Sequence, residues 1–201
     1  MPMQILNRCV ATTVLGLALA TVCAHATEPL GLDLHGAPIR SLARPGVRVV
    51  VLVFAASDCP ISNRYIPEIA RLAREFSPQG VRFWWVYPNA DDTASVVEQH
   101  NRDFSIPETP AMGTLLDAKQ TLVAMAHATT TPEAVIFLVE GSQLREVYNG
   151  RIDDRYISLG QERPQPEHHD LEAAIAAALA GKPIPQPAGR PVGCSIVFLP
   201  K

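Results

Sequence analysis

Residues 47–76 read VRVVVLVFAASDCPISNRYIPEIARLAREF, and this stretch decides the fold. Its first eight residues are nearly all apolar, as in a strand that is buried on both faces of a parallel sheet. A short polar turn with Cys59 follows, and apolar side chains then recur at helical spacing as far as Phe76. The sequence therefore predicts a strand, a turn and a helix, with a thiol where the helix begins. At that position the helix dipole and the free backbone N–H groups favour thiolate over thiol.

Length and composition indicate one globular domain behind a targeting segment. The chain has 201 residues, of which 47% are apolar, and its net charge is −3 without any basic run or stripe, so we expect no nucleic-acid partner. Arg8 precedes an apolar run at residues 10–22, and Ala24 and Ala26 are the small residues that a signal peptidase needs. We predict a signal peptide at residues 1–26, a periplasmic or secreted mature chain, and no membrane attachment after cleavage. A retained anchor is the alternative, although the apolar run is short for a span.

Cleavage changes the cysteine count. Cys9 and Cys23 leave with the signal peptide, and Cys59 and Cys194 remain. Two thiols in an oxidising compartment usually form a disulfide, a metal pair or a redox couple.

The remaining chain predicts an α/β domain at residues 27–181 and an extended, proline-rich tail at residues 182–201 that carries Cys194. The elements that we expect are strand 81–87, helix 93–104, strand 113–116, a short helix ending near residue 127, the hairpin strands 134–139 and 143–148, a polar loop at 149–169, and helix 171–180. The side chains that we expect to cap helices are Ser57 or Asp58, Asp91 or Asp92, Asp117, and Asp170.

This order of elements resembles the thioredoxin fold, in the variant found in peroxiredoxin-related redoxin proteins of the bacterial envelope. Cys59 begins a helix, Pro67 lies eight residues later where thioredoxin-like helices carry a kinking proline, and Thr131–Pro132 precedes a strand at the place of the family's cis-proline. The resemblance covers about residues 46–148. It implies a central mixed sheet flanked by helices, with a C-terminal helix and an extended tail. It also implies that Cys59 is a redox-active nucleophile whose partners are protein thiols, protein disulfides or a thiol reductant.

The chain departs from the family pattern at several positions. Thioredoxin-like proteins carry a second cysteine three residues after the first, where this chain has Ser62. Peroxiredoxins carry a threonine or serine and a proline where this chain has Ala56 and Leu52. Asp58 directly precedes Cys59 and should oppose thiolate formation. We therefore expect thiol–disulfide exchange and not peroxide reduction.

Cys194 can supply the missing second thiol. We predict that Cys59 attacks a disulfide and that Cys194 resolves the product. A cis Thr131–Pro132 bond would leave the backbone of Thr131 unpaired, facing Cys59 and open to an incoming extended chain. In the alternative interpretation, Cys59 and Cys194 form a permanent disulfide that pins the tail of a non-catalytic binding module.

A further alternative is a copper-binding or copper-transfer protein on the same fold, with Cu(I) held by Cys59, Cys194 and His127. Asn63 stands where a C-x3-C copper motif would have its second sulfur. We predict no other cofactor. Arg151 or Arg155 could fold back and lower the pKa of Cys59, or else belong to a solvated loop held by its own ion pairs.

Overall fold

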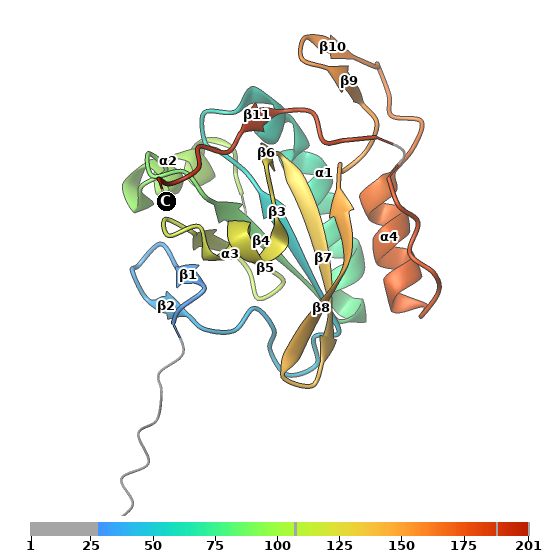
Figure 1. Ribbon diagram of the computed structural model, residues 1–201, viewed down its shortest axis with the longest axis horizontal. Coiled ribbons are helices and arrows are strands. Elements are labelled where there is room, and N and C mark those ends of the chain that lie inside the picture. The colour runs from blue at the N-terminus through green and yellow to red at the C-terminus, as the bar shows by residue number, and fades with distance from the viewer. Residues whose placement is uncertain (1–27, 107, 188, 201) are drawn as a thin grey trace, which may run out of the picture.

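The computed structural model describes residues 28–106, 108–187 and 189–200, so the predicted signal peptide lies outside the described residues. Its centre is a seven-stranded sheet with the strand order β2-β1-β5-β4-β3-β7-β8 (Figure 1). These strands are β1 (Gly31–Leu32), β2 (Pro38–Ile39), β3 (Val49–Phe54), β4 (Val81–Tyr87), β5 (Met112–Leu116), β7 (Glu133–Glu140) and β8 (Gln143–Gly150). The helices are α1 (Pro60–Phe76), α2 (Ala94–Asp103), α3 (Thr121–Ala126) and α4 (Asp170–Leu179), with a 3-10 turn η1 (Ser77–Gln79) after α1.

The sheet is mixed. Strands β3, β4 and β5 are parallel, whereas β7 runs antiparallel to β3 and forms a hairpin with β8. With helices on both faces, a C-terminal helix and an extended tail, this is a thioredoxin-like fold, and the predicted fold class is confirmed. No helix among the described residues is long and apolar enough to cross a membrane.

Strand β3 is the centre of the core because its side chains alternate between two covered faces. Val49, Val51 and Val53 pack on the face that α1 and α4 cover, and Val50 and Leu52 pack on the face that α3 covers. Every residue of β3 is at most 1% exposed. Burial on both faces explains why the strand has no alternating polar pattern.

Two predicted helix caps are wrong. The N-cap of α1 is Cys59 itself, and the N-cap of α2 is Thr93, whose hydroxyl accepts a hydrogen bond from the N–H of Val96. Ser57 and Asp92 are engaged with each other instead, because both the N–H and the hydroxyl of Ser57 donate to the Asp92 carboxylate. This contact ties the turn before Cys59 to the loop after β4.

The caps of the two later helices differ less from expectation. Asp117 accepts hydrogen bonds from the N–H groups of residues 121, 122 and 123 at the start of α3, as a capping carboxylate does. Asp170 is the first residue of α4, and the N-cap is His169.

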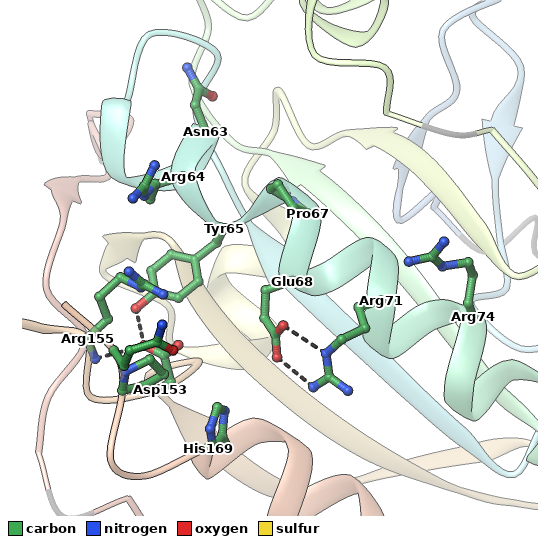
Figure 2. A pocket seen from close by; sticks show the side chains of 12 residues that line it. Asn63, Arg64, Tyr65, Pro67, Glu68, Arg71, Arg74, Asp153, Arg155 and His169 are labelled. Atoms are coloured by element: carbon green, nitrogen blue, oxygen red, sulfur yellow. Dashed lines mark hydrogen bonds and ion pairs between the residues drawn. The ribbon is translucent and has the colours of Figure 1, made fainter. Parts of the chain in front are cut away.

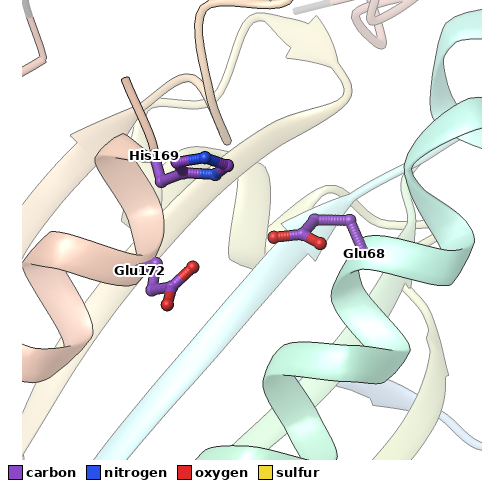
Figure 3. A group of neighbouring side chains, drawn as sticks. All are labelled: Glu68, His169 and Glu172. Atoms are coloured by element: carbon purple, nitrogen blue, oxygen red, sulfur yellow. The ribbon is translucent and has the colours of Figure 1, made fainter. Parts of the chain in front are cut away.

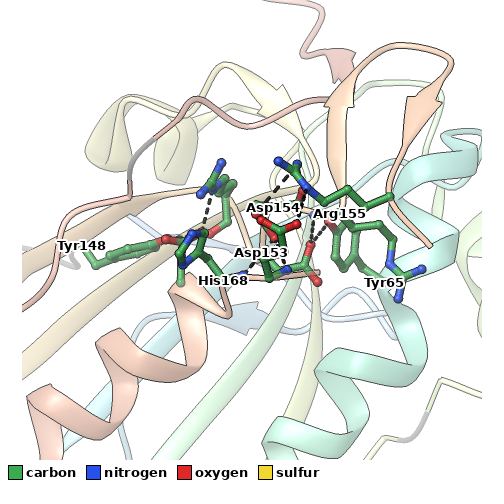
Figure 4. A network of polar contacts seen from close by, with 10 residues as sticks. Tyr65, Tyr148, Asp153, Asp154, Arg155 and His168 are labelled. Atoms are coloured by element: carbon green, nitrogen blue, oxygen red, sulfur yellow. Dashed lines mark hydrogen bonds and ion pairs between the residues drawn. The ribbon is translucent and has the colours of Figure 1, made fainter. Parts of the chain in front are cut away.

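The segment after β8 is more ordered than a plain loop. It contains a small hairpin of β9 (Tyr156–Ser158) and β10 (Gln161–Glu162). Figure 4 shows the polar network beneath it, in which the Tyr65 hydroxyl donates to Asp153 and the Asp154 carboxylate accepts the N–H groups of residues 167 and 168. Both carboxylates are at most 5% exposed. The network therefore holds this segment on α1 and on the entry to α4.

Candidate active site

Cys59 lies at the end of the turn that connects β3 to α1, at the carboxyl edge of the parallel strands. A tight turn, closed by the hydrogen bond from Cys59 N–H to the Ala56 carbonyl at 3.1 Å, follows the end of the strand. The helix begins when Asn63 N–H bonds the Cys59 carbonyl, also at 3.1 Å. The Cys59 side chain is 0% exposed. The predicted thiol at a helix N-terminus is therefore present, and it is completely covered.

The loop before β7 forms one wall of this site. The Thr131–Pro132 bond is cis, as expected from the sequence, and the Cys59 thiol donates to the Thr131 carbonyl oxygen at 3.2 Å. Glu133 holds the loop in place, because its buried carboxylate accepts hydrogen bonds from the N–H groups of Thr129 and Thr130 at 2.8 and 3.0 Å. Glu133 thus fixes the segment that contacts Cys59.

The C-terminal tail covers the other side of the site. Residues Cys194–Ser195 form strand β11, which pairs antiparallel with β6 (Thr130–Thr131), and Cys194 lies directly opposite Thr131. Figure 1 shows the tail crossing beside β6 at one end of the sheet. The expectation of an unpaired Thr131 backbone is therefore wrong, because the chain's own tail already occupies that edge. Cys59 and Cys194 are both free thiols.

Opposing effects act on the Cys59 thiol. Burial raises its pKa, but a hydrogen bond from the Cys194 thiol and contacts with Ser62 lower it by more, so the pKa lies below the ordinary value. The Ser62 N–H lies near the sulfur without the geometry of a full capping bond. Arg151 and Arg155 are not among the main groups that lower this pKa, and the Arg155 guanidinium donates to the Pro164 carbonyl, which favours the alternative of a loop held by its own contacts. Arg151 pairs instead with Asp170 at 2.6 Å.

Cys194 has the opposite character. Cys194 is exposed, but desolvation of its sulfur at the domain surface, the hydrogen bond to Cys59 and the negative charges of Cys59 and Asp58 raise its pKa to about 12. Asp58 therefore raises the pKa of Cys194. The sequence had suggested that Asp58 raises the pKa of Cys59, but Asp58 is not among the main groups that shift it. At neutral pH the pair consists of a thiolate-prone Cys59 and a protonated Cys194. This is the arrangement of a nucleophile with a hydrogen-bond donor beside it.

The pH titration of Cys59 tests this pairing. We expect Cys194→Ala to raise the pKa of Cys59, because the thiolate loses the hydrogen bond that stabilises its charge. Cys194→Ser retains a donor and should give an intermediate pKa. Thiolate absorbance in the ultraviolet, followed against pH with Cys59→Ser as the blank, measures the midpoint. An alanine variant that titrates at or below the wild-type midpoint would contradict this assignment.

His127 does not complete a copper site. The described residues contain no group in which the donor atoms of Cys59, Cys194 and His127 lie within 4.8 Å of one another. His127 ends α3 and lines a hollow beside Phe198 and Leu199 of the tail. The residues present therefore do not fit the alternative of a Cu(I) site.

Two other clusters bring three ligand-type side chains together, but neither contains a cysteine. They are Glu68, His169 and Glu172, drawn in Figure 3, and Asp154, Glu167 and His168. In the first, Arg71 already pairs with both carboxylates. In the second, the carboxylate of Asp154 accepts two backbone N–H groups. Both clusters are accounted for by hydrogen bonds and ion pairs of the chain itself.

A cavity of about 600 Å³ lies along α1, and neither cysteine lines it (Figure 2). Its walls include Arg64 and Arg155, and the hydrogen-bonded pair of Tyr65 and Asp153 stands at one side. The cavity opens between α1 and the segment after β8. Asn63 lines it, and the Asn63 N–H makes the backbone bond to Cys59 with which the helix begins. The cavity is therefore separate from the thiol pair.

The chain combines a thioredoxin-like fold with two free thiols, which lie on either side of Thr131. Neither a protein-family model nor a curated protein sequence matches the chain. Among solved structures, an uncharacterized conserved protein from Geobacillus kaustophilus is 24% identical with a TM-score of 0.67, over 87% of this chain and 90% of that one. A hypothetical protein from Sinorhizobium meliloti is 20% identical with a TM-score of 0.65, over 83% and 88% of the two chains.

A secreted disulfide oxidoreductase of Mycobacterium tuberculosis also resembles this chain more distantly. It is 18% identical with a TM-score of 0.47, over 75% of this chain and 93% of that one. At these identities the similarity to the first two structures shows a shared fold, and the chemistry of the site has to be argued from its own residues.

Sequence reasoning missed several residues around the cysteines. Gln120 and Asn89 bind the tail by their side-chain amides, Ile196 buries its side chain in the core, and Glu133 fixes the loop before β7. Only Glu133 had a signal in the sequence: it is a carboxylate directly after the expected cis-proline, at the start of a strand predicted to be buried.

Proposed function

We propose that this protein is an exported thiol–disulfide oxidoreductase of the redoxin type, with Cys59 as nucleophile and Cys194 as resolving cysteine. The observation that supports this most is the placement of both cysteines at Thr131: the Cys59 thiol donates to the Thr131 carbonyl, and Cys194 pairs with Thr131 in the neighbouring strand β11. The lowered pKa of Cys59 and the raised pKa of Cys194 fit the two roles. Its partners are protein disulfides and a thiol couple that restores the starting state.

The reaction has two exchange steps. The Cys59 thiolate attacks one sulfur of a substrate disulfide, forms a mixed disulfide and releases the other sulfur as a thiolate. Cys194 then loses its proton and attacks Cys59, which forms the Cys59–Cys194 disulfide and releases the second substrate thiolate. Two electrons pass from the protein to the substrate, and the same steps run in reverse when the protein oxidises a dithiol.

The first step prepares the second. The hydrogen bond to Cys59 and the negative charge on Cys59 are two of the effects that raise the pKa of Cys194. Both are lost once the Cys59 sulfur is in a mixed disulfide and carries no charge. Cys194 then ionises more readily at the stage where a second nucleophile is needed. Thr131 and Pro132 form the wall of the site beside Cys59. The Thr131 carbonyl accepts a hydrogen bond from the Cys59 thiol.

Turnover of a disulfide-linked peptide tests the proposal. We expect wild-type protein to catalyse its reduction by a thiol buffer, and Cys59→Ser to reduce the rate to the uncatalysed level because a hydroxyl cannot form the mixed disulfide. Ser142→Ala, in the exposed turn between β7 and β8, is the matched control and should keep wild-type turnover. Equal rates for wild type and Cys59→Ser would sink the proposed function.

A further inference from the structure

The tail is bound to the domain mainly through its backbone. Ile196 N–H donates to the Thr129 carbonyl at 3.0 Å, and the Thr131 hydroxyl donates to the Cys194 carbonyl at 3.3 Å. Gln120 acts as a clamp, because its amide donates to the Val197 carbonyl at 2.7 Å and accepts the N–H of residue 199 at 3.0 Å. Partners from separate segments thus bind an extended chain as a sheet edge binds an added strand.

Side chains of the tail matter at two positions beside the cysteine. A Cβ atom on Gly193 would lie 2.0 Å from the Thr131 carbonyl oxygen, so no larger residue fits before the cysteine. Ile196, two residues after it, is 3% exposed and packs in the core between the sheet and α3. By contrast, Val197 and Phe198 are 71% and 57% exposed. The groove therefore selects a glycine and an aliphatic residue and tolerates the rest.

The docked tail closes the site. Cys59 is 0% exposed while residues 193–199 are in place. A protein disulfide needs an approach to the Cys59 sulfur along the axis of its own S–S bond. The edge of β6 that would align such a substrate already pairs with β11. A substrate and the tail therefore compete for the same groove.

We propose that residues 193–199, which we call the strap, are an internal stand-in for the substrate, and that the groove beneath them takes an extended polypeptide of the form Gly-Cys-x-aliphatic. The proposal rests on the proposed function of Cys59 and names its substrate class. The strap leaves the groove to admit the substrate. It returns with Cys194, which attacks Cys59 and resolves the mixed disulfide. The substrate is therefore released in the same step that brings the strap back into the groove.

Synthetic peptides test what the groove selects. The full chain with Cys194→Ser is mixed with the peptide PVGCSIVF, which copies residues 191–198 and carries thionitrobenzoate on its cysteine as a disulfide. The Cys59 thiolate attacks the peptide sulfur, the mixed disulfide forms and the coloured thiolate leaves. We expect the peptide changes Gly193→Val and Ile196→Asp each to slow this release about tenfold or more, through steric exclusion and lost burial. The peptide change Val197→Ala is the matched control and should keep the rate.

The outcomes separate the two proposals. Equal rates for all peptides would overturn the groove's selectivity and leave the function of Cys59 intact. No release with any peptide would overturn both. Selective slowing at positions 193 and 196 supports the strap as a substrate copy.

Loosening the strap in the full protein gives an independent readout. Gln120 has a backbone φ of 56°, which asparagine tolerates. In Gln120→Asn the side chain is one methylene shorter, so its amide no longer reaches its two partners in the strap. We expect Cys59 in Gln120→Asn, with Cys194→Ser in the background, to be alkylated about tenfold faster, as the loss of two hydrogen bonds predicts. Gln79→Ala, an exposed glutamine in η1, is the control. An unchanged rate in Gln120→Asn would contradict the strap as the cover of Cys59.

Discussion

Cys194→Ser should convert the protein from a catalyst into a trap for its substrates. Cys59 still attacks a disulfide, but the hydroxyl at position 194 cannot displace the substrate from it. An external thiol must then do what a neighbouring thiol does in the wild type, and the loss of that intramolecular advantage should lower turnover by about a hundredfold or more. Steady-state turnover measures the loss, and mass spectrometry under non-reducing conditions identifies the covalent adduct at Cys59.

The same experiment contains its control. The double variant Cys59→Ser, Cys194→Ser should neither turn over nor form an adduct. Wild-type turnover in Cys194→Ser without an adduct would mean that Cys59 works with external thiols alone, and the role of Cys194 would have to be withdrawn.

A second large effect should come from position 62. Ser62 lies one helical turn after Cys59 and is 1% exposed, and its hydroxyl makes no full hydrogen bond to any of the described residues. The resemblance to thioredoxin-like proteins makes this the place of a second cysteine. We expect Ser62→Cys in the Cys194→Ser background to raise turnover about tenfold or more over Cys194→Ser alone, because it restores an intramolecular resolving thiol.

Ser62→Ala in the same background is the matched control, since it removes the hydroxyl and adds no thiol. It should show no rescue and should turn over at or below the level of Cys194→Ser, because the Ser62 side chain is among the groups that lower the pKa of Cys59. On oxidation, the rescued variant should also form a disulfide between Cys59 and the cysteine introduced at position 62, which peptide mapping detects. A variant that forms this disulfide but shows no rescue would argue that the lost step in Cys194→Ser is not resolution.

The sequence predicted the fold well because the decisive signals were local. The apolar run of β3, the helical spacing of α1 and the hairpin of β7 and β8 each follow from a periodicity within one segment. The wrong caps had a non-local cause. Ser57 and Asp92 are good capping residues that bond each other across the fold, and no pattern within either segment announces this contact.

The site was only partly predictable for the same reason. The structure brings Cys59, Thr131 and Cys194 together, as the hypothesis of a resolving tail required. It does not bring His127 to them. The side chain of Gln120 bonds two tail residues that lie 77 and 79 positions later in the sequence. A glutamine in a loop carries no local sign of such partners. Sequence reasoning therefore found the two thiols and missed what holds them in place.

The reduction potential of the Cys59–Cys194 pair tests the central claim most directly. Equilibration in glutathione buffers of graded redox poise, followed by acid quenching and mass spectrometry, gives the fraction of protein with the disulfide. Because the lowered pKa of Cys59 stabilises the reduced form, we predict a reversible couple between about −270 and −120 mV. A value below about −300 mV would identify a permanent staple and contradict the proposal that Cys194 resolves disulfides on Cys59.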